Sequence, residues 1–263
     1  MLWLVAPAAG QAEAEDPQIL VRQVVTNELQ AQQNDHTYWM YVSEVQGPEN
    51  TRSQYVIETK EGALTRLIAE DGHALTLKQQ QQEDMRINIL IRNPDELRKQ
   101  KHEHKRDAQK KQELLKMLPE GFLYQYDGDE GRNIRLSFRA NPRFRPATRE
   151  AKVFRAIQGM VLIDAREKRL VELRGELTRD VVFGWGILGR LYAGGTFAVQ
   201  QREVAPGHWE ATLIDVRIRG KALFFKTIGE QQHELRSDFR QVSGNITLEQ
   251  AAAMLKEEAA KGR

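Results

Sequence analysis

The chain has 263 residues, of which 40% are hydrophobic and 29% are charged, and this is sufficient for one large core or two small ones. A net charge of +2 excludes a strongly basic nucleic-acid-binding domain, so only local basic clusters are candidates for such contacts. The absence of cysteine excludes disulfides, thiolate sites and a lipid-modified cysteine as a membrane anchor.

The first residues, MLWLVAPAAGQAEA, form an apolar run followed by small residues. The sequence around Ala12 and Ala14 resembles a signal-peptidase site, although the usual basic leader is missing. We therefore predict that residues 1–14 are a clipped secretory signal and that the protein is periplasmic, exported and not lipid-anchored. The alternative is a frayed N-terminal segment of a cytosolic protein.

The next elements are an amphipathic helix and a meander of strands. Apolar residues at helical spacing predict a helix over residues 19–33, directly after Asp16-Pro17. From Thr37 the period changes to two, and turn residues at 47–50, 61–62 and 71–72 divide the segment into three strands.

A long charged helix is predicted over about 93–118, opened by Asn93-Pro94 and ended by Pro119. Its apolar residues are sparse until position 114, so we expect most of it to lie in water with only its C-terminal end docked. His102 and His104 lie two positions apart and point away from each other on a helix, so no metal site is predicted.

The second half of the chain predicts more strands. Alternating residues follow one another at 121–128, 132–140, 160–177 and 208–227, with a hairpin turn at 165–168. This many alternating segments with tight turns favours a large antiparallel sheet with one polar face. Residues 244–263 are expected to form a C-terminal helical tail, because Thr247 and Gln250 occupy capping-box positions.

The stretch VVFGWGILGRLYAGGTFAVQ, residues 181–200, contains the spacing G-x-G-x-x-G. A dinucleotide-binding turn needs a helix after the glycines, and Gly194-Gly195 would end such a helix too early. The run is also too short and interrupted to span a membrane. The default interpretation is a glycine-rich turn that joins two strands.

The order of these elements, together with the segment QGMVLIDAREKRLVELRGEL at 158–177, resembles the LolA/LolB-like superfamily of periplasmic, outer-membrane lipoprotein-sorting-like proteins. The resemblance covers roughly residues 19–239. It implies an α+β fold in which a large curved antiparallel sheet, a half-open β-barrel, is packed over helices and encloses an apolar cavity for acyl chains. A single domain is then expected over 15–243, with the charged helical insertion inside it.

In such a half-barrel the glycine-rich stretch would let a strand bend, and its apolar side chains would line the cavity or its lip. The alternative is that these side chains fill a core. The candidate ligand-binding residues are Phe183, Trp185, Ile187, Leu188, Leu191 and Tyr192.

A basic cluster extends from Arg132 to Arg155 and contains one acid, Glu150. Arginine forks suit phosphate and carboxylate groups, so the cluster is a candidate contact for lipid headgroups or an acidic partner. The alternative is a solvated strand face and loop, and the few interleaved aromatics argue against nucleic acid. The candidate contact residues are Arg139, Arg143, Arg145 and Arg149.

The sequence contains no nucleophile elbow, no Ser-His-Asp order in a plausible context and no metal quartet, so no enzymatic activity and no cofactor are predicted. Asp164, Glu172 and Asp215 are expected on the outer face of the sheet. The predicted function is a non-enzymatic periplasmic carrier or binder of lipid or lipoprotein acyl chains, without a transmembrane segment in the mature chain. The alternative is an RseB-like envelope-sensing module that binds a protein partner.

Overall fold

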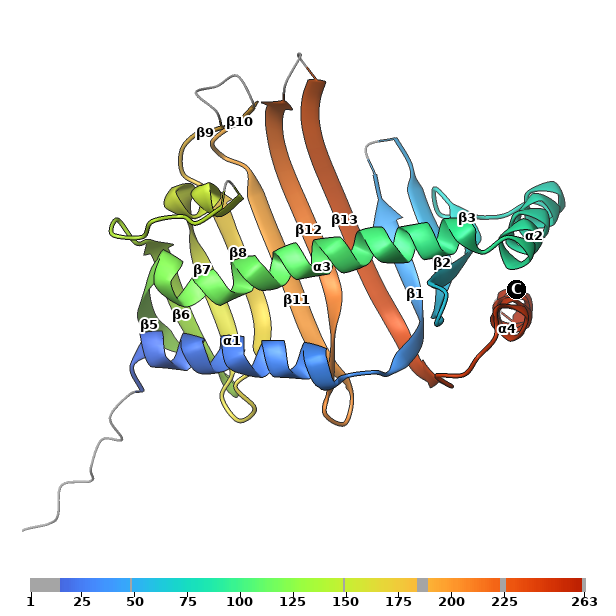
Figure 1. Ribbon diagram of the computed structural model, residues 1–263, viewed down its shortest axis with the longest axis horizontal. Coiled ribbons are helices and arrows are strands. Elements are labelled where there is room, and N and C mark those ends of the chain that lie inside the picture. Colours follow the sequence, from blue (N-terminus) through green and yellow to red (C-terminus); the bar gives the residue numbers. More distant parts are fainter. Residues whose placement is uncertain (1–14, 48, 149, 184–188, 223–225, 262–263) are drawn as a thin grey trace, which may run out of the picture.

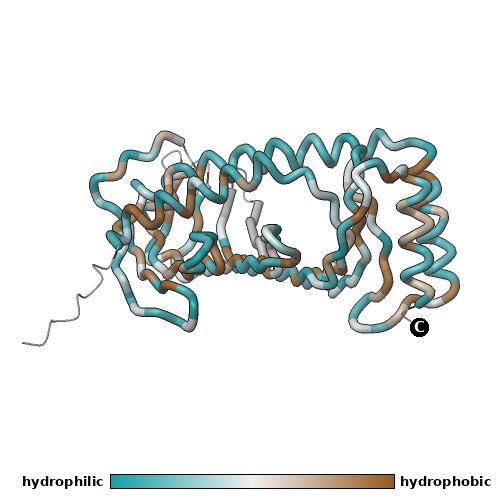
Figure 2. Tube along the Cα trace, turned by 90° about the horizontal axis from the view of Figure 1, so that it is seen from below, coloured by the Kyte–Doolittle hydropathy of each residue, from teal (hydrophilic) through white to brown (hydrophobic). Residues whose placement is uncertain are grey.

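The computed structural model describes residues 15–47, 49–148, 150–183, 189–222 and 226–261. Within these ranges the chain forms one antiparallel sheet of 13 strands, which is curved and not closed, together with five helices. The predicted α+β class, with a large half-open antiparallel sheet packed over helices, is confirmed. Figures 1 and 2 show the sheet with α1 and α3 on its concave side.

The helices are α1 (Pro17–Asn34), α2 (Leu77–Arg92), α3 (Asp95–Gly121), the 3-10 helix η1 (Glu150–Ala156) and α4 (Leu248–Lys261). The strands are β1 (Tyr38–Gln46), β2 (Thr51–Glu58), β3 (Ala63–Glu70), β4 (His73–Ala74), β5 (Phe122–Glu130), β6 (Asn133–Ala140), β7 (Ile157–Asp164), β8 (Leu170–Leu177), β9 (Val181–Phe183), β10 (Gly189–Leu191), β11 (Thr196–Ala205), β12 (His208–Ala222) and β13 (Lys226–Val242). The sheet order is β4-β3-β2-β1-β13-β12-β11-β8-β7-β6-β5, and β10 pairs with β12 and β9. The last long strand therefore pairs with the first.

One end of the molecule, the β5–β8 end, consists of α1, the C-terminal part of α3, η1 and strands β5 to β8. The Asp16 side chain accepts the N–H of Gln18 at 2.8 Å and starts α1, as expected from Asp16-Pro17. The apolar face of α1 then packs on the sheet. Its core contains Leu20, Val21, Val24, Val25, Leu136, Val161 and Ile163, and a second cluster contains Phe122, Phe138 and Phe154.

The other end, the α2–α4 end, consists of α2, α4, β1 to β3 and the start of α3. Its core joins residues from all of these elements: Met40, Ile57, Leu64, Ile87, Leu97, Leu248, Ala251 and Leu255. The segment expected as a helical tail is thus α4, whose apolar face is part of a core. Helix α2 has no counterpart among the elements that we predicted from the sequence, although Thr76 and Gln79 form a capping box at its start.

Helix α3 crosses the concave side of the sheet from one packed end to the other (Figures 1 and 2). With 27 residues it is roughly 40 Å long at about 1.5 Å per residue. Its C-terminal leucines pack at the β5–β8 end, while Leu97 near its start is 2% exposed in the α2–α4 core. The expectation that only the C-terminal end docks was wrong, because one leucine is enough to fix the first turn. Residues 98–111 are all exposed.

Candidate functional site

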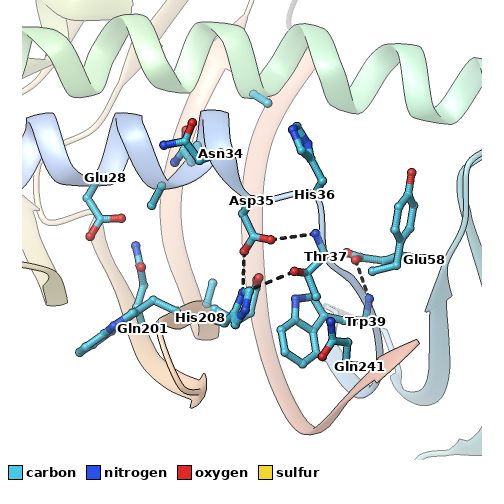
Figure 3. Close-up of a pocket in the computed structure, with 18 of the residues that line it drawn as sticks. Glu28, Asn34, Asp35, His36, Thr37, Trp39, Glu58, Gln201, His208 and Gln241 are labelled. Carbon is cyan, nitrogen blue, oxygen red and sulfur yellow. Dashed lines mark hydrogen bonds and ion pairs between the residues drawn. The ribbon is translucent and has the colours of Figure 1, made fainter. Parts of the chain in front are cut away.

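A cavity of about 930 Å³ lies between the end of α1, the middle of α3 and the adjoining ends of β11, β12, β13 and β1 (Figure 3). A volume of this size lies in the range of sites that hold one small molecule. The cavity is open to one side of the molecule, since part of its lining comes from exposed residues of α3.

The cavity exists because the middle of α3 carries no large apolar side chain. Between Leu97 and Leu114 the only apolar residue of the helix is Ala108, which lines the cavity beside Lys111 and Gln112. Charged side chains lose hydration when they are pressed onto a sheet, so this part of the helix has no reason to pack. The helix is held at its ends and leaves space beneath its middle.

Asp35, at the end of α1, anchors one side of the cavity. Its carboxylate accepts the N–H of Thr37 at 2.8 Å and lies 3.2 Å from Nδ1 of His208 (Figure 3). Burial acts to raise the pKa of Asp35, but these hydrogen bonds and the charge of His208 outweigh it and hold that pKa below the usual value. The His208 ring also meets Trp39 edge-on, with 5.6 Å between ring centroids. This contact ties the start of β12 to β1.

Two half-buried carboxylates of the cavity, Glu58 and Glu210, have no ion-pair partner among the residues that the structure describes. Glu58 accepts the main-chain N–H of Trp39 at 3.0 Å (Figure 3). Burial raises the pKa of Glu58. Burial, reinforced by the negative charges of Glu58 and Asp35, raises the pKa of Glu210 to about 7.

A fourth carboxylate of the cavity, Glu28, is fully engaged. Its oxygens accept Nε and Nη2 of Arg169 at 2.8 and 3.2 Å, and one of them also accepts the N–H of Leu170 at 2.9 Å. The Arg169 guanidinium lies 5.6 Å from the ring centre of Trp209, whose indole N–H donates to Glu167 at 2.9 Å. These contacts fix α1 to the sheet and form a rigid wall of the cavity.

The concave face near the cavity also carries a buried polar network on β1 and β13. Glu234 accepts the hydroxyl of Ser43 at 3.1 Å and Nε of Arg236 at 2.6 Å. These hydrogen bonds outweigh burial and lower the pKa of Glu234. The Arg236 guanidinium lies 5.5 Å from the ring centre of Tyr41, and burial raises the pKa of Tyr41 to about 12. The lining that the resemblance implied was apolar, whereas this part of the concave face is polar.

An apolar strip adjoins this polar part on β11 and β12. The register places Phe197 opposite Val216 and Val199 opposite Ile214, so these four side chains share one face of the sheet. Phe197 and Ile218 contact the phenylalanine cluster of the β5–β8 end, which places the strip on the concave side. All five side chains are half-buried. The strip and the cavity together offer a polar end and an apolar surface.

The candidate ligand-binding residues from the sequence lie elsewhere. Trp185, Ile187, Leu188 and the side chain of Phe183 lie outside the described residues. Leu191 packs against the phenylalanine cluster, and the N–H of Tyr192 donates to the carbonyl of Arg219 at 2.9 Å, so neither lines the cavity. Gly189 begins a strand that pairs with β9 and β12, which agrees with the interpretation of a turn between strands.

The candidate contact arginines lie on β6 and the loop that follows it. Arg139, Arg143 and Arg145 are exposed and none of them lines the cavity, while Arg149 lies outside the described residues. Arg145 donates to the carbonyl of Pro142 at 3.4 Å. The loop therefore presents guanidinium groups to solvent at the β5–β8 end.

The remaining candidates from the sequence do not come together. Asp164 was expected on the outer face but is 2% exposed, because it accepts the N–H groups of Arg166 and Glu167 and closes the turn between β7 and β8. Asp215 contacts His233 at 3.2 Å on the opposite face from the cavity. His102 and His104 are exposed. Across the described ranges, no three His, Cys, Asp or Glu residues form a group that could hold a metal ion.

The residues that form the cavity gave little signal in the sequence. Asp35 and His208 are separated by 173 positions, and each lies at the end of an element where polar residues are common. The informative signal was the long stretch of α3 between Leu97 and Leu114 that contains no large apolar residue. This stretch predicts that the middle of the helix does not pack on the sheet. It does not predict which residues of the sheet lie beneath the helix.

Comparison of the chain with protein-family models, with curated proteins and with solved structures finds no match. Of the helices that the structure describes, none combines the length and the apolar character that crossing a membrane requires.

Proposed function

We propose that the protein is a non-enzymatic periplasmic carrier or binder of a lipid or of a lipoprotein acyl chain. It holds this amphipathic ligand between α3 and the concave face of the sheet. The acyl or other apolar chain of the ligand lies on the strip of β11 and β12, and its polar end lies in the cavity. One observation carries this proposal: a cavity of about 930 Å³ beneath a helix that is docked only at its ends.

The packing of α3 supports this proposal, because both ends of the helix are packed in a core and its middle is not. The two cores fix the ends of α3, so the space below residues 98–111 does not depend on any contact made by the middle of the helix. A ligand can occupy that space without displacing packed side chains, and this keeps the cost of binding low. The same arrangement fits the half-barrel carriers that the element order resembles.

Binding of a neutral fluorescent acyl probe, the methyl ester of a labelled fatty acid, to the delipidated protein tests the proposal. We expect saturable binding with a blue-shifted emission, and Ala108→Phe should weaken it at least tenfold because the ring enters the space that the ligand occupies. Gln109→Phe is the matched control, since this exposed neighbour does not line the cavity. Absence of saturable binding, or equal effects of the two variants, would overturn the proposal.

A second pair of variants tests the apolar strip. Val216→Asp places a charge on the strip and should weaken binding of the acyl probe, because an unpaired charge in apolar surroundings is strongly unfavourable. Leu235→Asp introduces the same charge on β13 at a side chain that is 43% exposed and should leave binding unchanged. Thermal unfolding measured beside the titrations separates a loss of affinity from a loss of fold.

The exposed loop arginines favour a second function, that of an RseB-like module that binds an acidic protein partner. Arg139, Arg143 and Arg145 have no carboxylate partner in the part of the chain that the structure describes. Immobilised protein would then retain an envelope protein in a salt-sensitive manner, and replacing the three arginines by glutamine would abolish retention. Retention that is unchanged in the triple variant would contradict this function.

A further inference from the structure

Four carboxylates line the cavity, whereas Lys111 and Arg169 are its two lining residues with a permanent positive charge among the described residues. Glu28 is paired with Arg169, and Asp35 with His208. Glu58 and Glu210 remain without an ion pair among the described residues, although both are half-buried. Two like charges in a partly dehydrated space repel each other, and a cation that enters the space relieves this repulsion.

On this basis, and resting on the function proposed above, we propose that the polar end of the ligand is a cationic amine that binds between Glu58 and Glu210. An alkylammonium group there forms charge-assisted hydrogen bonds with both carboxylates. Its chain then continues along the apolar strip of β11 and β12. The ligand class is therefore a long-chain amine rather than a fatty acid.

The cations around the cavity do not favour an anionic ligand. Arg236 of β13 is bound to Glu234 at 2.6 Å, and Arg169, just before β8, is bound to Glu28 at 2.8 Å. Lys111 of α3 lines the cavity but is exposed, so water screens its charge. An anionic head group would have to displace one of these pairs or lie beside two carboxylates.

The indole of Trp39 gives independent support for a ligand. Trp39 lines the cavity and is 3% exposed, yet its Nε1 has no hydrogen-bond partner within the described residues. A buried N–H without an acceptor costs free energy, and an acceptor that enters the cavity with a ligand would relieve this cost.

The charge of Glu210 makes the affinity for an amine depend on pH. Its pKa of about 7 means that the carboxylate is ionised at pH 8 and mostly neutral at pH 6, while an alkylamine stays protonated throughout. Amine affinity should therefore fall on acidification. Other titratable or charged groups face Glu210 from each neighbouring element: Asp35 after α1, Tyr41 of β1, Glu58 of β2, His208 of β12, Arg236 of β13, Lys111 of α3 and the exposed Arg202 of β11, which is opposite Glu210 in the register.

Competition between two matched chains tests the inference. Dodecylamine and dodecanoic acid, each below its critical micelle concentration, are titrated at pH 8 against the neutral probe Nile red bound to the full chain. We expect dodecylamine to displace the probe at a concentration at least tenfold lower. Equal displacement by both, or preference for the acid, would overturn the amine assignment and leave the carrier proposal standing. Failure of Nile red and both chains to bind would refute the carrier itself.

Variants of the two carboxylates test whether the amine binds between Glu58 and Glu210. Glu58→Gln and Glu210→Gln should each reduce the preference for dodecylamine at least threefold, and the double variant should remove it. Glu44→Gln is the control, because this exposed carboxylate of β1 alternates with the concave residue Ser43 and so points to the other side of the sheet. Glu210→Gln should also flatten the change in amine affinity between pH 8 and pH 6. An unchanged preference in both single variants would refute the site.

Discussion

The packed ends and the central region beneath α3 are built from different kinds of contact. At the ends, helices press apolar faces on the sheet, and side chains such as Ile163 and Leu255 are fully buried. In the central region the sheet presents carboxylates and an arginine, and the helix above it carries no large apolar residue. Stability is therefore concentrated at the ends, and this leaves the centre free for a ligand.

The same contrast holds for buried charges. Glu28, at the border of the β5–β8 end, satisfies both oxygens with Arg169 and the N–H of Leu170. Glu210 in the central region has no ion-pair partner among the described residues, and burial, together with the charges of Glu58 and Asp35, raises its pKa. A paired carboxylate stabilises its region, whereas an unpaired one costs free energy that only a ligand or a proton relieves.

The largest effect is expected from removing core volume at an end. Ile163→Ala should lower the free energy of unfolding by about 4 kcal/mol, because the residue is fully buried and leaves a cavity. Ile214→Ala in the half-buried apolar strip should cost about 1 kcal/mol. Urea unfolding measures both. Equal costs would show that the centre is packed like the ends.

A smaller loss is expected from the paired carboxylate. Glu28→Gln should cost about 3 kcal/mol, since it leaves the buried Arg169 without its counter-charge. The same urea measurement at pH 7 gives the value, and Glu44→Gln on the exposed face of β1 should change stability by less than about 0.5 kcal/mol. If the two variants behave alike, the pair makes no net contribution.

The unpaired carboxylate should show the opposite sign. The folded-state pKa of Glu210 lies above its usual value, so its favourable contribution is present below pH 4.5 and is lost as the pH rises through about 7. Glu210→Gln does not undergo this loss and should be more stable than the parent by on the order of 2 kcal/mol at pH 8, and not at pH 4.5. Thermal unfolding across this pH range checks the trend. A pH-independent difference would contradict it.

The smallest effect is expected in the middle of α3. Ala108→Gly should cost only the difference in helix propensity, about 1 kcal/mol, because this part of the helix packs on nothing. Leu97→Ala, by contrast, removes the residue that docks the first turn and should cost about 3 kcal/mol. A cost above about 2 kcal/mol for Ala108→Gly would mean that the middle of the helix is packed after all.

The sequence by itself determined the elements whose signals are local. The helical period of α1, the turns of the β1–β3 meander and the hairpin between β7 and β8 were all predicted, because each depends on neighbouring residues alone. The antiparallel sheet followed from the same alternation, whereas its open, curved form was implied by the family resemblance. Helix α2 was not predicted, since its glutamine-rich start obscures the apolar period and its core face consists mainly of Ile87.

Only the tertiary structure decided which residues form the cavity. Pairing of the last long strand with the first brings β13 beside β1 and β12 next to β13, and the end of α1 then lies over them. This places His208 and Glu210 next to Asp35 and Glu58, although about 150 positions or more separate the two pairs along the chain. No periodicity encodes such an encounter, because a polar residue at the end of a strand has the same local signature whether it faces water or a buried partner.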